Sequence, residues 1–236
     1  MKTSVLIIAH NEEKHIAQCI TSVLNQTQKP DEVVVVCHNC TDSTESIVGR
    51  FPMVKLVSYH GPQGITYARI EGLKHVKGKK ILCTDGDSYV AKNWVKEMCH
   101  TLAKGHVLVG SWMKFEGTAF GWFANFWNKY RSVRQKNVAR MIWGPSMGFW
   151  GKDIDVVLGI FQKSFALSTQ LGLERNPDDY WLALFMKMRG SLGMTNKTFV
   201  TQHTKETSSI EAVVRSSENV SDAEKMEKYF RNAIEE

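Results

Sequence analysis

The sequence predicts an α/β fold, in which helices flank a doubly wound, mostly parallel sheet and the C-terminal half is elaborated. Three observations predict it. Between Ser4 and Ser111, short runs rich in β-branched residues alternate with helical patterns, the runs are apolar throughout, and the segments between them carry apolar stripes. Continuous apolar runs of this length suit strands buried on both faces of a parallel sheet. We expect these strands at residues 5–9, 33–36, 54–57, 81–84 and 107–109.

Two of the intervening segments show the spacing of an amphipathic helix. One stripe comprises Ile16, Ile20, Val23 and Leu24, and the other comprises Trp94, Val95, Met98 and Leu102. Repeated units of strand, helix and strand place the helices on the faces of one sheet. The pattern predicts that both segments are helices of that kind.

The pattern changes after Ser111, where aromatic residues become frequent and the alternation of strand and helix is lost. We expect a helical insert, then a strand near residues 147–150 and a helix over residues 179–189. A polar amphipathic helix follows from Ser221, and its inward residues are Met226, Tyr229, Phe230 and Ala233. The length of 236 residues suits one domain that spans the whole chain, residues 1–236.

Composition and charge narrow the classes of protein. The net charge of +6, from 30 basic and 24 acidic residues, suits an anionic partner without choosing among nucleotide, phospholipid and nucleic acid. Five cysteines in a chain of this size argue against a secreted disulfide scaffold and favour a reducing compartment. No uncharged apolar stretch approaches the ~18 residues of a membrane span. We therefore expect a cytoplasmic protein, with contact to the inner face of a membrane as the alternative.

Polar loops follow the predicted strands at residues 10–13, 37–41, 60–64 and 85–88. In doubly wound sheets, ligands bind beyond the carboxyl ends of the strands, so these loops should converge on one crevice. A purely structural loop has less need of His, Asn, Asp and Gly together. This coincidence is the first indication of a functional site.

The strongest local signal is the Asp85-Gly86-Asp87 turn directly after the apolar strand at residues 81–84. Two carboxylates so close together are unfavourable unless a cation neutralises them. A hard divalent ion would bridge them to a diphosphate and stabilise the charge of a leaving phosphate. The structural alternative is an ordinary turn rich in Asp and Gly.

Two further loops admit both a structural and a functional interpretation. Helix capping and ligand contact are equally good interpretations of the polar residues Asn11, Glu12 and Glu13. The Cys37-x-x-Cys40 motif after the second strand is also found in redox dithiols and in zinc sites, but no second pair with metal-ligand spacing exists here. We treat the redox and zinc interpretations as minor alternatives.

Five motifs in order resemble the family 2 glycosyltransferases. They are residues 5–12 (VLIIAHNE), 22–27 (SVLNQT), 39–44 (NCTDST), Ala68-Arg69-x-x-Gly72, and Asp85-Gly86-Asp87-Ser88. The resemblance covers nearly all of the first 115 residues. Beyond them it rests on residues 144–148 (GPSMG) and on residues 178–190, which begin with Asp178-Asp179.

The resemblance implies a GT-A fold and a metal-dependent, inverting transfer of sugar from a nucleotide diphosphate sugar to an acceptor hydroxyl. The donor-binding part would be residues 1–111, and the acceptor-binding part and C-terminal helix residues 112–236. The acceptor would be a saccharide or a lipid-linked molecule, and the cofactor Mn²⁺ or Mg²⁺, with no nucleic acid as partner. The nucleotide-binding residues would be Ala9, His10, Asn11, Glu12, His38, Asn39, Asp42, Gly64, Arg69, Asp85 and Gly86.

Residue roles follow from the same resemblance. Asp87 would be the main metal ligand, assisted by Asp85, with His203 as a further candidate, and Arg69 would lie near the diphosphate. Many relatives end the second strand in a carboxylate that helps to read uracil, whereas this chain has Cys37 and His38 there. The identity of the nucleotide therefore stays open.

Asp179 occupies the position of the family's catalytic carboxylate, usually preceded by Glu and here preceded by Asp178. Either could be the general base, or both could simply stabilise a helix start after Pro177. Adjacent helical residues point about 100° apart, so only one can face the acceptor hydroxyl. We expect it to be Asp179, because a buried side formed by Leu182, Phe185 and Met188 or Arg189 would include it.

Two other functions remain as alternatives. A nucleotidyltransferase also uses strand-end Asp pairs with metal, and a binding module could keep the nucleotide pocket without turnover.

The aromatic insert suits an anionic membrane surface or a lipid-linked acceptor, although we expect most of it to pack on the sheet. Its residues are Trp122, Phe123, Phe126, Trp127 and Tyr130, followed by Arg131, Arg134, Lys136 and Arg140.

Overall fold

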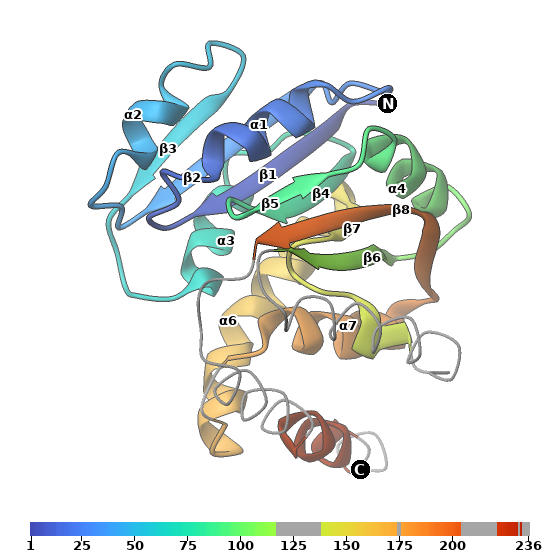
Figure 1. Ribbon diagram of the computed structural model, residues 1–236. Helices are drawn as coiled ribbons and strands as arrows, with labels where there is room; N and C mark the ends of the chain where they lie inside the picture. The colour runs from blue at the N-terminus through green and yellow to red at the C-terminus, as the bar shows by residue number, and fades with distance from the viewer. Residues whose placement is uncertain (117–137, 174–175, 204–220, 231, 233–236) are drawn as a thin grey trace.

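The computed structural model describes residues 1–116, 138–173, 176–203, 221–230 and 232. An eight-stranded sheet forms its centre, in the order β3-β2-β1-β4-β7-β6-β8-β5 (Figure 1). The strands are β1 (Thr3–Ala9), β2 (Glu32–His38), β3 (Lys55–Tyr59), β4 (Lys80–Asp85), β5 (Ser88–Val90), β6 (Leu108–Glu116), β7 (Met147–Trp150) and β8 (Leu192–His203). The helices are α1 (Ile16–Leu24), α2 (Thr44–Val48), α3 (Ile65–Leu73), α4 (Trp94–Leu102), α6 (Ile154–Gln170) and α7 (Asp178–Arg189), with short 3-10 turns η1 (Val138–Met141) and η2 (Gly151–Asp153).

The sheet is mixed and mostly parallel, as the sequence predicts. β1 pairs in parallel with β2 and β4, β2 with β3, and β6 with β8. The antiparallel pairs are β4 with β7, β6 with β7, and β5 with β8. The parallel half brings the carboxyl ends of β1, β2 and β4 to one edge, which is where the sequence predicts the site.

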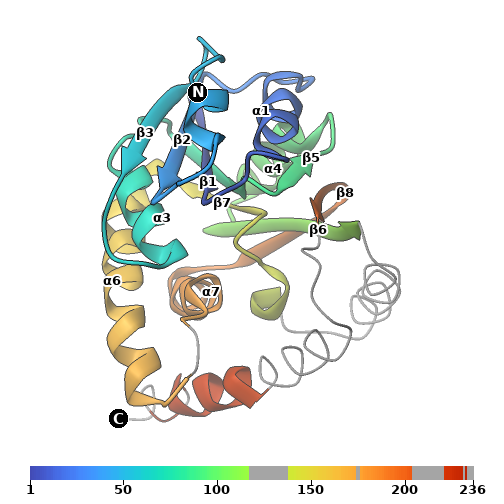
Figure 2. The same ribbon diagram turned by 60° about the vertical axis from the view of Figure 1, so that its left-hand side comes forward.

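Both faces of the sheet are covered, which explains why the strands are apolar throughout. Along β1, Val5 and Ile7 belong to a core with α1, α2 and α4, while Leu6 and Ile8 belong to a second core with α3, α6 and α7. Figures 1 and 2 show the two groups of helices on opposite faces. Since a strand's side chains alternate between faces, a sheet buried on both sides needs apolar residues at every position.

Strands β5 and β8 and helix α6 are among the elements that the sequence analysis does not predict. In α6, the buried residues Val157, Ile160, Phe161, Ser164 and Ser168 lie on one helical face, but two of them are serines, which weakens the apolar signal. β8 crosses the sheet beside β6 and carries polar residues along much of its length. Both elements belong to the half of the chain where the alternation of strand and helix is lost.

The C-terminal half agrees with the other expectations where it is described. β7 occupies residues 147–150, α7 begins within one residue of the predicted start, and residues 221–230 are helical with Met226 and Phe230 buried. The aromatic insert from Trp122 to Lys136 lies outside the described residues, and so does the side chain of Arg140. No helix in the described ranges is both long and apolar enough to cross a membrane.

Candidate active site at the carboxyl ends of the strands

The Asp85-Gly86-Asp87 turn joins β4 to β5 and packs against the end of β1. Gly86 donates its N–H to the Ile8 carbonyl at 2.7 Å, and a Cβ at Gly86 would lie 3.0 Å from the Cβ of Ala9. A side chain at position 86 would therefore push the turn away from β1. This close approach holds the two carboxylates at the strand end, as the sequence predicts.

Asp85 faces a buried guanidinium. Arg69, on α3, reaches Asp85 Oδ1 through Nη2 at 3.3 Å, and the two side chains are 3% and 14% exposed. Burial raises the pKa of Asp85 to about 7; Arg69 opposes the rise, and the charges of Asp87 and Asp178 add to it. A carboxylate in such surroundings gains strongly from a nearby cation, because the cation favours its ionised form.

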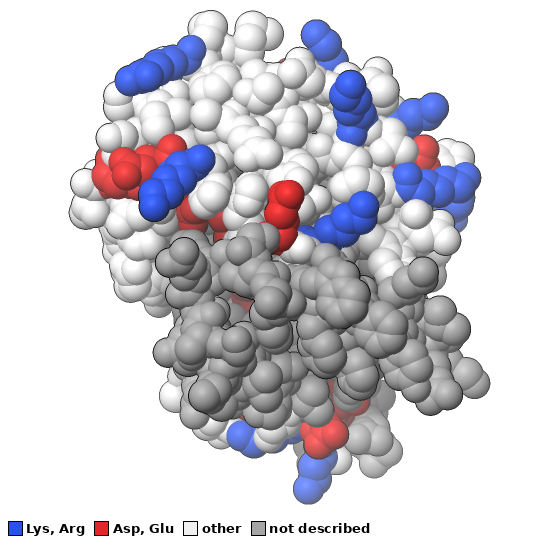
Figure 3. Space-filling view, viewed as in Figure 1, with Lys and Arg blue, Asp and Glu red and all other residues white. Residues whose placement is uncertain are grey.

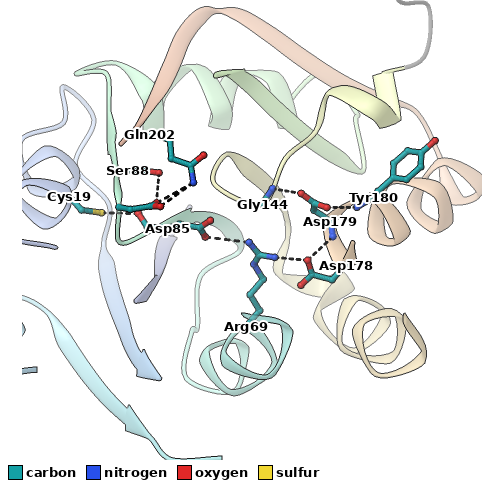
Figure 4. Close-up of polar contacts among 10 residues, drawn as sticks. Cys19, Arg69, Asp85, Ser88, Gly144, Asp178, Asp179, Tyr180 and Gln202 are labelled. Carbon is teal, nitrogen blue, oxygen red and sulfur yellow. Dashed lines mark hydrogen bonds and ion pairs between the residues drawn. The ribbon is translucent and has the colours of Figure 1, made fainter. Parts of the chain in front are cut away.

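The same guanidinium connects Asp85 to the start of α7. Arg69 Nη1 lies 2.6 Å from Asp178 Oδ1, and both side chains are 3% exposed. Asp178, the first residue of α7, also accepts the N–H of Asp179 through Oδ1 at 2.9 Å. Figure 4 shows Arg69 between Asp85 and Asp178. The Asp178 carboxylate is therefore occupied by its ion pair with Arg69 and its hydrogen bond to the first turn of α7.

Asp179 points to a different neighbour, the loop before β7. Its Oδ2 accepts the N–H of Gly144 at 2.8 Å, and its Oδ1 accepts the N–H of Tyr180 at 2.8 Å. Burial raises the pKa of Asp179, and the adjacent charge of Asp178 raises it further. A raised pKa makes a carboxylate a better proton acceptor near neutral pH.

The helix-face argument for Asp179 is wrong, although the structure still separates the two carboxylates. Met188 is 60% exposed, whereas Trp181 and Ala183, next to Leu182 in the chain, are fully buried. The helix is enclosed by α6, η1 and the sheet, so burial extends around most of its circumference. The distinction between Asp178 and Asp179 comes from their partners, Arg69 and Gly144, and not from a single buried stripe.

Residues of β5 and β8 donate hydrogen bonds to Asp87. Its carboxylate accepts the hydroxyl of Ser88 at 3.1 Å and the amide Nε2 of Gln202 at 3.2 and 3.4 Å. The N–H of His203 donates to the Asp87 carbonyl at 2.9 Å. Sequence reasoning missed Gln202 because β8 was not expected; the Thr-Phe-Val-Thr run at residues 198–201 was the available signal.

His203, the further candidate ligand, contacts Asp87 through its backbone. Its ring stacks on His15 with centroids 4.3 Å apart, and Nε2 lies 3.1 Å from Gln18 Oε1. Within the described part of the chain, no group of three or more His, Cys, Asp and Glu side chains could hold a metal ion. A cation at Asp85 and Asp87 would need additional oxygen ligands.

The donor set nevertheless fits a hard divalent cation. Around the turn, the groups with oxygen atoms are the carboxylates of Asp85 and Asp87, the Ser88 hydroxyl and the Gln202 amide. Mg²⁺ and Mn²⁺ prefer carboxylate, carbonyl and water oxygens, and such ions are usually bound by one or two carboxylates together with phosphate oxygens. The residues present therefore suit an ion that arrives with a diphosphate.

The loops after β1 and β2 are bound to each other. Asn11 Oδ1 accepts the N–H of Thr41 at 2.8 Å, and the Glu12 N–H donates to the Thr44 hydroxyl at 2.8 Å. The N–H of Glu13 donates to Asp42 at 3.1 Å, and Asp42 also accepts the Thr44 N–H at 2.9 Å. Burial opposes the shift, but these hydrogen bonds lower the pKa of Asp42. Hydrogen bonds that anchor the two loops thus account for much of the polarity here, and neither α1 nor α2 has a side-chain hydrogen bond at its N-cap.

A second set of predicted nucleotide contacts surrounds His38 at the end of β2. His38 is buried, its Nε2 lies 2.9 Å from the Pro62 carbonyl, and its ring stacks on Tyr59. Burial lowers the pKa of His38. His10 Nδ1 lies 2.7 Å from the His38 carbonyl, and Asn39 Oδ1 accepts the Gly61 N–H at 3.1 Å. His38 and Asn39 therefore shape the loop as well as offering polar groups.

Backbone geometry explains Gly64, which precedes α3. Its φ of 137° lies where residues with a Cβ rarely occur, so the entry into α3 requires glycine. This turn sets where α3 begins and hence where Arg69 projects. Gly64 contributes to the site through the backbone.

The cysteines after β2 differ in environment. All five cysteines are free thiols; Cys37 is buried and Cys40 is partly exposed. A hydrogen bond from Cys37 lowers the pKa of Cys40 to about 7, although burial opposes the shift. The same contact raises the pKa of Cys37.

Basic and acidic side chains are interspersed on the described part of the face shown in Figure 3. On the face shown in Figure 3, Lys and Arg side chains of the described residues lie at several separate places, and acidic side chains lie between some of them. An extended basic surface would be expected for a nucleic-acid-binding face. Figure 4 shows the candidate site as a row of side chains, from Gln202 and Ser88 through Asp85 and Arg69 to Asp178 and Asp179.

Comparisons with known proteins identify the family and the fold. The model of the family described as "Glycosyl transferase family 2" matches residues 4–158. "Glycosyltransferase GlyA" of Streptococcus pneumoniae is 26% identical over 119 residues, which are 48% of this chain and 17% of the relative.

Two solved structures show the fold. The mannosyltransferase PcManGT from Pyrobaculum calidifontis, in complex with GDP-Man and Mn²⁺, aligns with a TM-score of 0.70 and 20% identity over 100% of this chain and 64% of its own. TarS from S. aureus, in complex with UDP-GlcNAc, aligns with a TM-score of 0.62 and 17% identity over 89% of this chain and 61% of its own. This chain spans less than two thirds of the length of each of these three proteins. Because the family model covers well over half of the sequence, the chain belongs to glycosyl transferase family 2, and its sheet is that of a GT-A glycosyltransferase domain.

Proposed function

We propose that the domain transfers a sugar from a nucleotide diphosphate sugar to an acceptor hydroxyl, with inversion and with Mn²⁺ or Mg²⁺ at Asp85 and Asp87. The observation that carries the proposal is the buried row in which Arg69 joins Asp85 to Asp178, next to Asp179. In this proposal, the Asp85 end of the row would bind a cation and a diphosphate, and Asp179 at the other end would supply the base. The neighbours that contain GDP-Man with Mn²⁺, or UDP-GlcNAc, support this assignment.

The chemistry follows from the charges. A single displacement at the anomeric carbon breaks the bond to the diphosphate as the acceptor oxygen attacks, and the acceptor loses its proton to a base. Asp179 is the proposed base, because its pKa is raised and its carboxylate is not paired with Arg69 in the described contacts. The cation, when bound, would stabilise the negative charge of the departing diphosphate.

Arg69 and Asp178 have positioning roles in this proposal. Arg69 partly neutralises Asp85 and holds α7 against α3, so Asp179 stays in register with the donor end of the site. Residues 1–111 would bind the donor, and residues 112–236 would bind the acceptor, a saccharide or a lipid-linked molecule. Nucleotide contacts would come from the loops after β1 and β2 and from the start of α3.

The proposal is tested by combining thermal shift with product release. The protein is incubated with UDP-, GDP- and dTDP-sugars, with and without Mn²⁺, and both melting temperature and free nucleoside diphosphate are measured. A ligand that binds the folded state raises the melting temperature, and the rise grows with the ratio of ligand concentration to Kd. We expect a Mn²⁺-dependent shift and slow release of nucleoside diphosphate with at least one donor.

Variants make this test specific to the turn. Asp87→Ala should abolish the Mn²⁺-dependent shift, whereas Asp155→Ala, which removes an exposed carboxylate on α6, should leave it unchanged. A shift without release would favour a non-catalytic binding module. Pyrophosphate release from a nucleoside triphosphate and a sugar phosphate would favour a nucleotidyltransferase. Unchanged Mn²⁺-dependent binding by Asp87→Ala would refute the metal assignment.

A further inference from the structure

The Asp87 carboxylate is bound by two donors, although the turn is predicted to hold a cation. The Ser88 hydroxyl donates to Oδ1 at 3.1 Å, and the Gln202 amide nitrogen lies 3.4 Å from Oδ1 and 3.2 Å from Oδ2. Gln202 therefore spans both oxygens of the carboxylate. These oxygens are the atoms that a metal ion would need.

The orientation of the Gln202 amide follows from charge. An ionised carboxylate only accepts hydrogen bonds, so the amide has to present its NH₂ group to Asp87. Its carbonyl oxygen belongs to the same planar group, and rotation about the last side-chain bond exchanges the two ends. The amide can thus offer a donor to a bare carboxylate and an oxygen ligand to a cation from one position.

The backbone fixes where this amide lies. Gln202 is opposite Ser88 in the antiparallel β5–β8 pair and beside Phe115 in the β6–β8 pair. The next residue, His203, donates its N–H to the Asp87 carbonyl at 2.9 Å. Strand β8 is therefore attached to Asp87 through both backbone and side chain, and the amide of Gln202 stays within reach of the turn.

A cation at this turn needs oxygen ligands beyond the two carboxylates. Mg²⁺ requires near-octahedral coordination, and carbonyl oxygens are suitable neutral ligands for Mg²⁺ and Mn²⁺. In the described chain, acidic and imidazole side chains do not supply a third ligand, and the His203 ring is stacked on His15. Gln202 is the neutral side chain that already contacts Asp87 from outside the turn.

We propose that Gln202 is a ligand of the divalent cation, binding it through Oε1 after its amide turns over from the hydrogen bond to Asp87. The inference rests on the proposed function, since it assumes a cation at Asp85 and Asp87. It assigns to Gln202 the place that the sequence assigns to His203. It also means that loading of the cation breaks the bond between the β8 side chain and Asp87.

The test is a Mn²⁺ titration of the whole chain, read by the electron paramagnetic resonance signal of free Mn²⁺, alone and with UDP or GDP. Gln202→Leu, which cannot supply oxygen, should weaken Mn²⁺ binding by about tenfold. His203→Ala keeps the backbone bond to Asp87 and should bind Mn²⁺ within about twofold of wild type. Gln202→Glu keeps an oxygen ligand and should bind Mn²⁺ at least as tightly as wild type.

Thermal stability separates this role from a merely structural one. Gln202→Glu places a third carboxylate beside Asp87, so its melting temperature should fall without Mn²⁺ and recover when Mn²⁺ is added. A structural role for Gln202 would lower the melting temperature equally with and without Mn²⁺, and this outcome would overturn the inference.

Equal Mn²⁺ affinity of wild type and Gln202→Leu, or a larger loss in His203→Ala, would also overturn it while leaving the proposed function intact. If wild type binds no Mn²⁺ with either nucleotide, the metal assignment itself fails. If Gln202→Leu does not fold, the Gln202→Glu and His203→Ala titrations decide the matter.

Discussion

Arg69 and Asp178, which are 109 residues apart in the chain, form a buried ion pair with Nη1 and Oδ1 2.6 Å apart. The pair joins α3 to the start of α7, and Arg69 Nη2 extends the contact to Asp85 on β4. Arg69 Nε and Asp178 Oδ2 are buried and have no hydrogen-bond partner among the residues that the structure describes. A buried charge network that leaves polar atoms unsatisfied is costly in stability, and the proposed function gives it a positioning role.

The first prediction concerns stability. Asp178→Asn should reduce the free energy of unfolding by about 3 kcal/mol, because it leaves the Arg69 charge buried with Asp85 as its remaining close partner. Asp179→Asn is the matched control and should cost about 1 kcal/mol or less, since an amide oxygen can still accept the Gly144 N–H. Urea unfolding of both variants measures the difference. Equal losses would contradict the view that Asp178 is the paired carboxylate.

The second prediction concerns catalysis. Asp179→Asn should lower kcat by about 100-fold or more while donor affinity stays near that of wild type, as expected when a general base is removed. Asp178→Asn should retain measurable turnover, and we expect any decrease in kcat to come from misplacement of Arg69 and α7. Turnover and donor affinity are measured separately for each variant. If Asp178→Asn loses the rate and Asp179→Asn stays active, the roles are reversed.

The pH dependence gives an independent check on the same residue. The pKa of Asp179 is raised by burial and by Asp178, so the base form is lost at a higher pH than for an ordinary carboxyl group. Replacing Asp178 by Asn removes one cause of the increase and lowers the pKa of Asp179. The acidic limb of the kcat profile should therefore move to lower pH in Asp178→Asn. An unmoved limb would show that another group titrates there.

Much of the fold was predictable because its signal is local. Apolar β-branched runs, such as residues 33–36, report burial on both faces without reference to any other segment, and a strand forms at each predicted position. The Asp85-Gly86-Asp87 turn was predictable for the same reason, since two carboxylates at a strand end are unusual in themselves. The parallel pairing among β1, β2, β3 and β4 is the pairing expected from their alternation with helices.

Contacts between distant segments were not predictable in this way. Arg69 follows Ala68 in a helix whose sequence shows no sign that the guanidinium is buried, and its partner Asp178 lies on another helix. Gln202 lies on β8, a strand whose polar positions weaken the apolar pattern. The distinction between Asp178 and Asp179 lies in their partners Arg69 and Gly144, and periodicity within α7 does not reveal it because burial extends around most of the helix.

The third prediction tests the packing of the loop before β7 against Arg69. A Cβ at Gly144 would overlap the Arg69 guanidinium, so Gly144→Ala has to displace Arg69 or the loop. The expected cost is about 1–3 kcal/mol of stability, together with a fall in turnover, because the Gly144 N–H also binds Asp179. Urea unfolding and donor turnover measure the two effects.

Gly159→Ala is the control for this change. Gly159 lies within α6, and a Cβ there would meet nothing within 4 Å. Alanine should stabilise the helix by roughly 0.5–1 kcal/mol and leave turnover unchanged. If both alanine variants behave alike, contact with Arg69 does not explain why position 144 is glycine.

The last prediction concerns Cys40, whose thiol lies beside the loop after β1. Its Sγ is 3.5 Å from the Asn11 N–H and 3.7 Å from the Ala9 carbonyl oxygen. A hydrogen bond from Cys37 lowers the pKa of Cys40 to about 7, and the bond from Asn11 lowers it further against the effect of burial. An unperturbed cysteine has a pKa of about 8.5.

The thiolate reacts with alkylating agents and the thiol does not, so Cys40 should be modified first by iodoacetamide, at a rate that rises through a midpoint near pH 7. The other four cysteines are buried and should react more slowly. Cys37→Ala removes the hydrogen bond, so the midpoint for Cys40 should rise toward that of an ordinary thiol. Mass spectrometry of peptides alkylated over a range of pH measures these rates, and an unchanged midpoint in Cys37→Ala would show that another group sets the reactivity of Cys40.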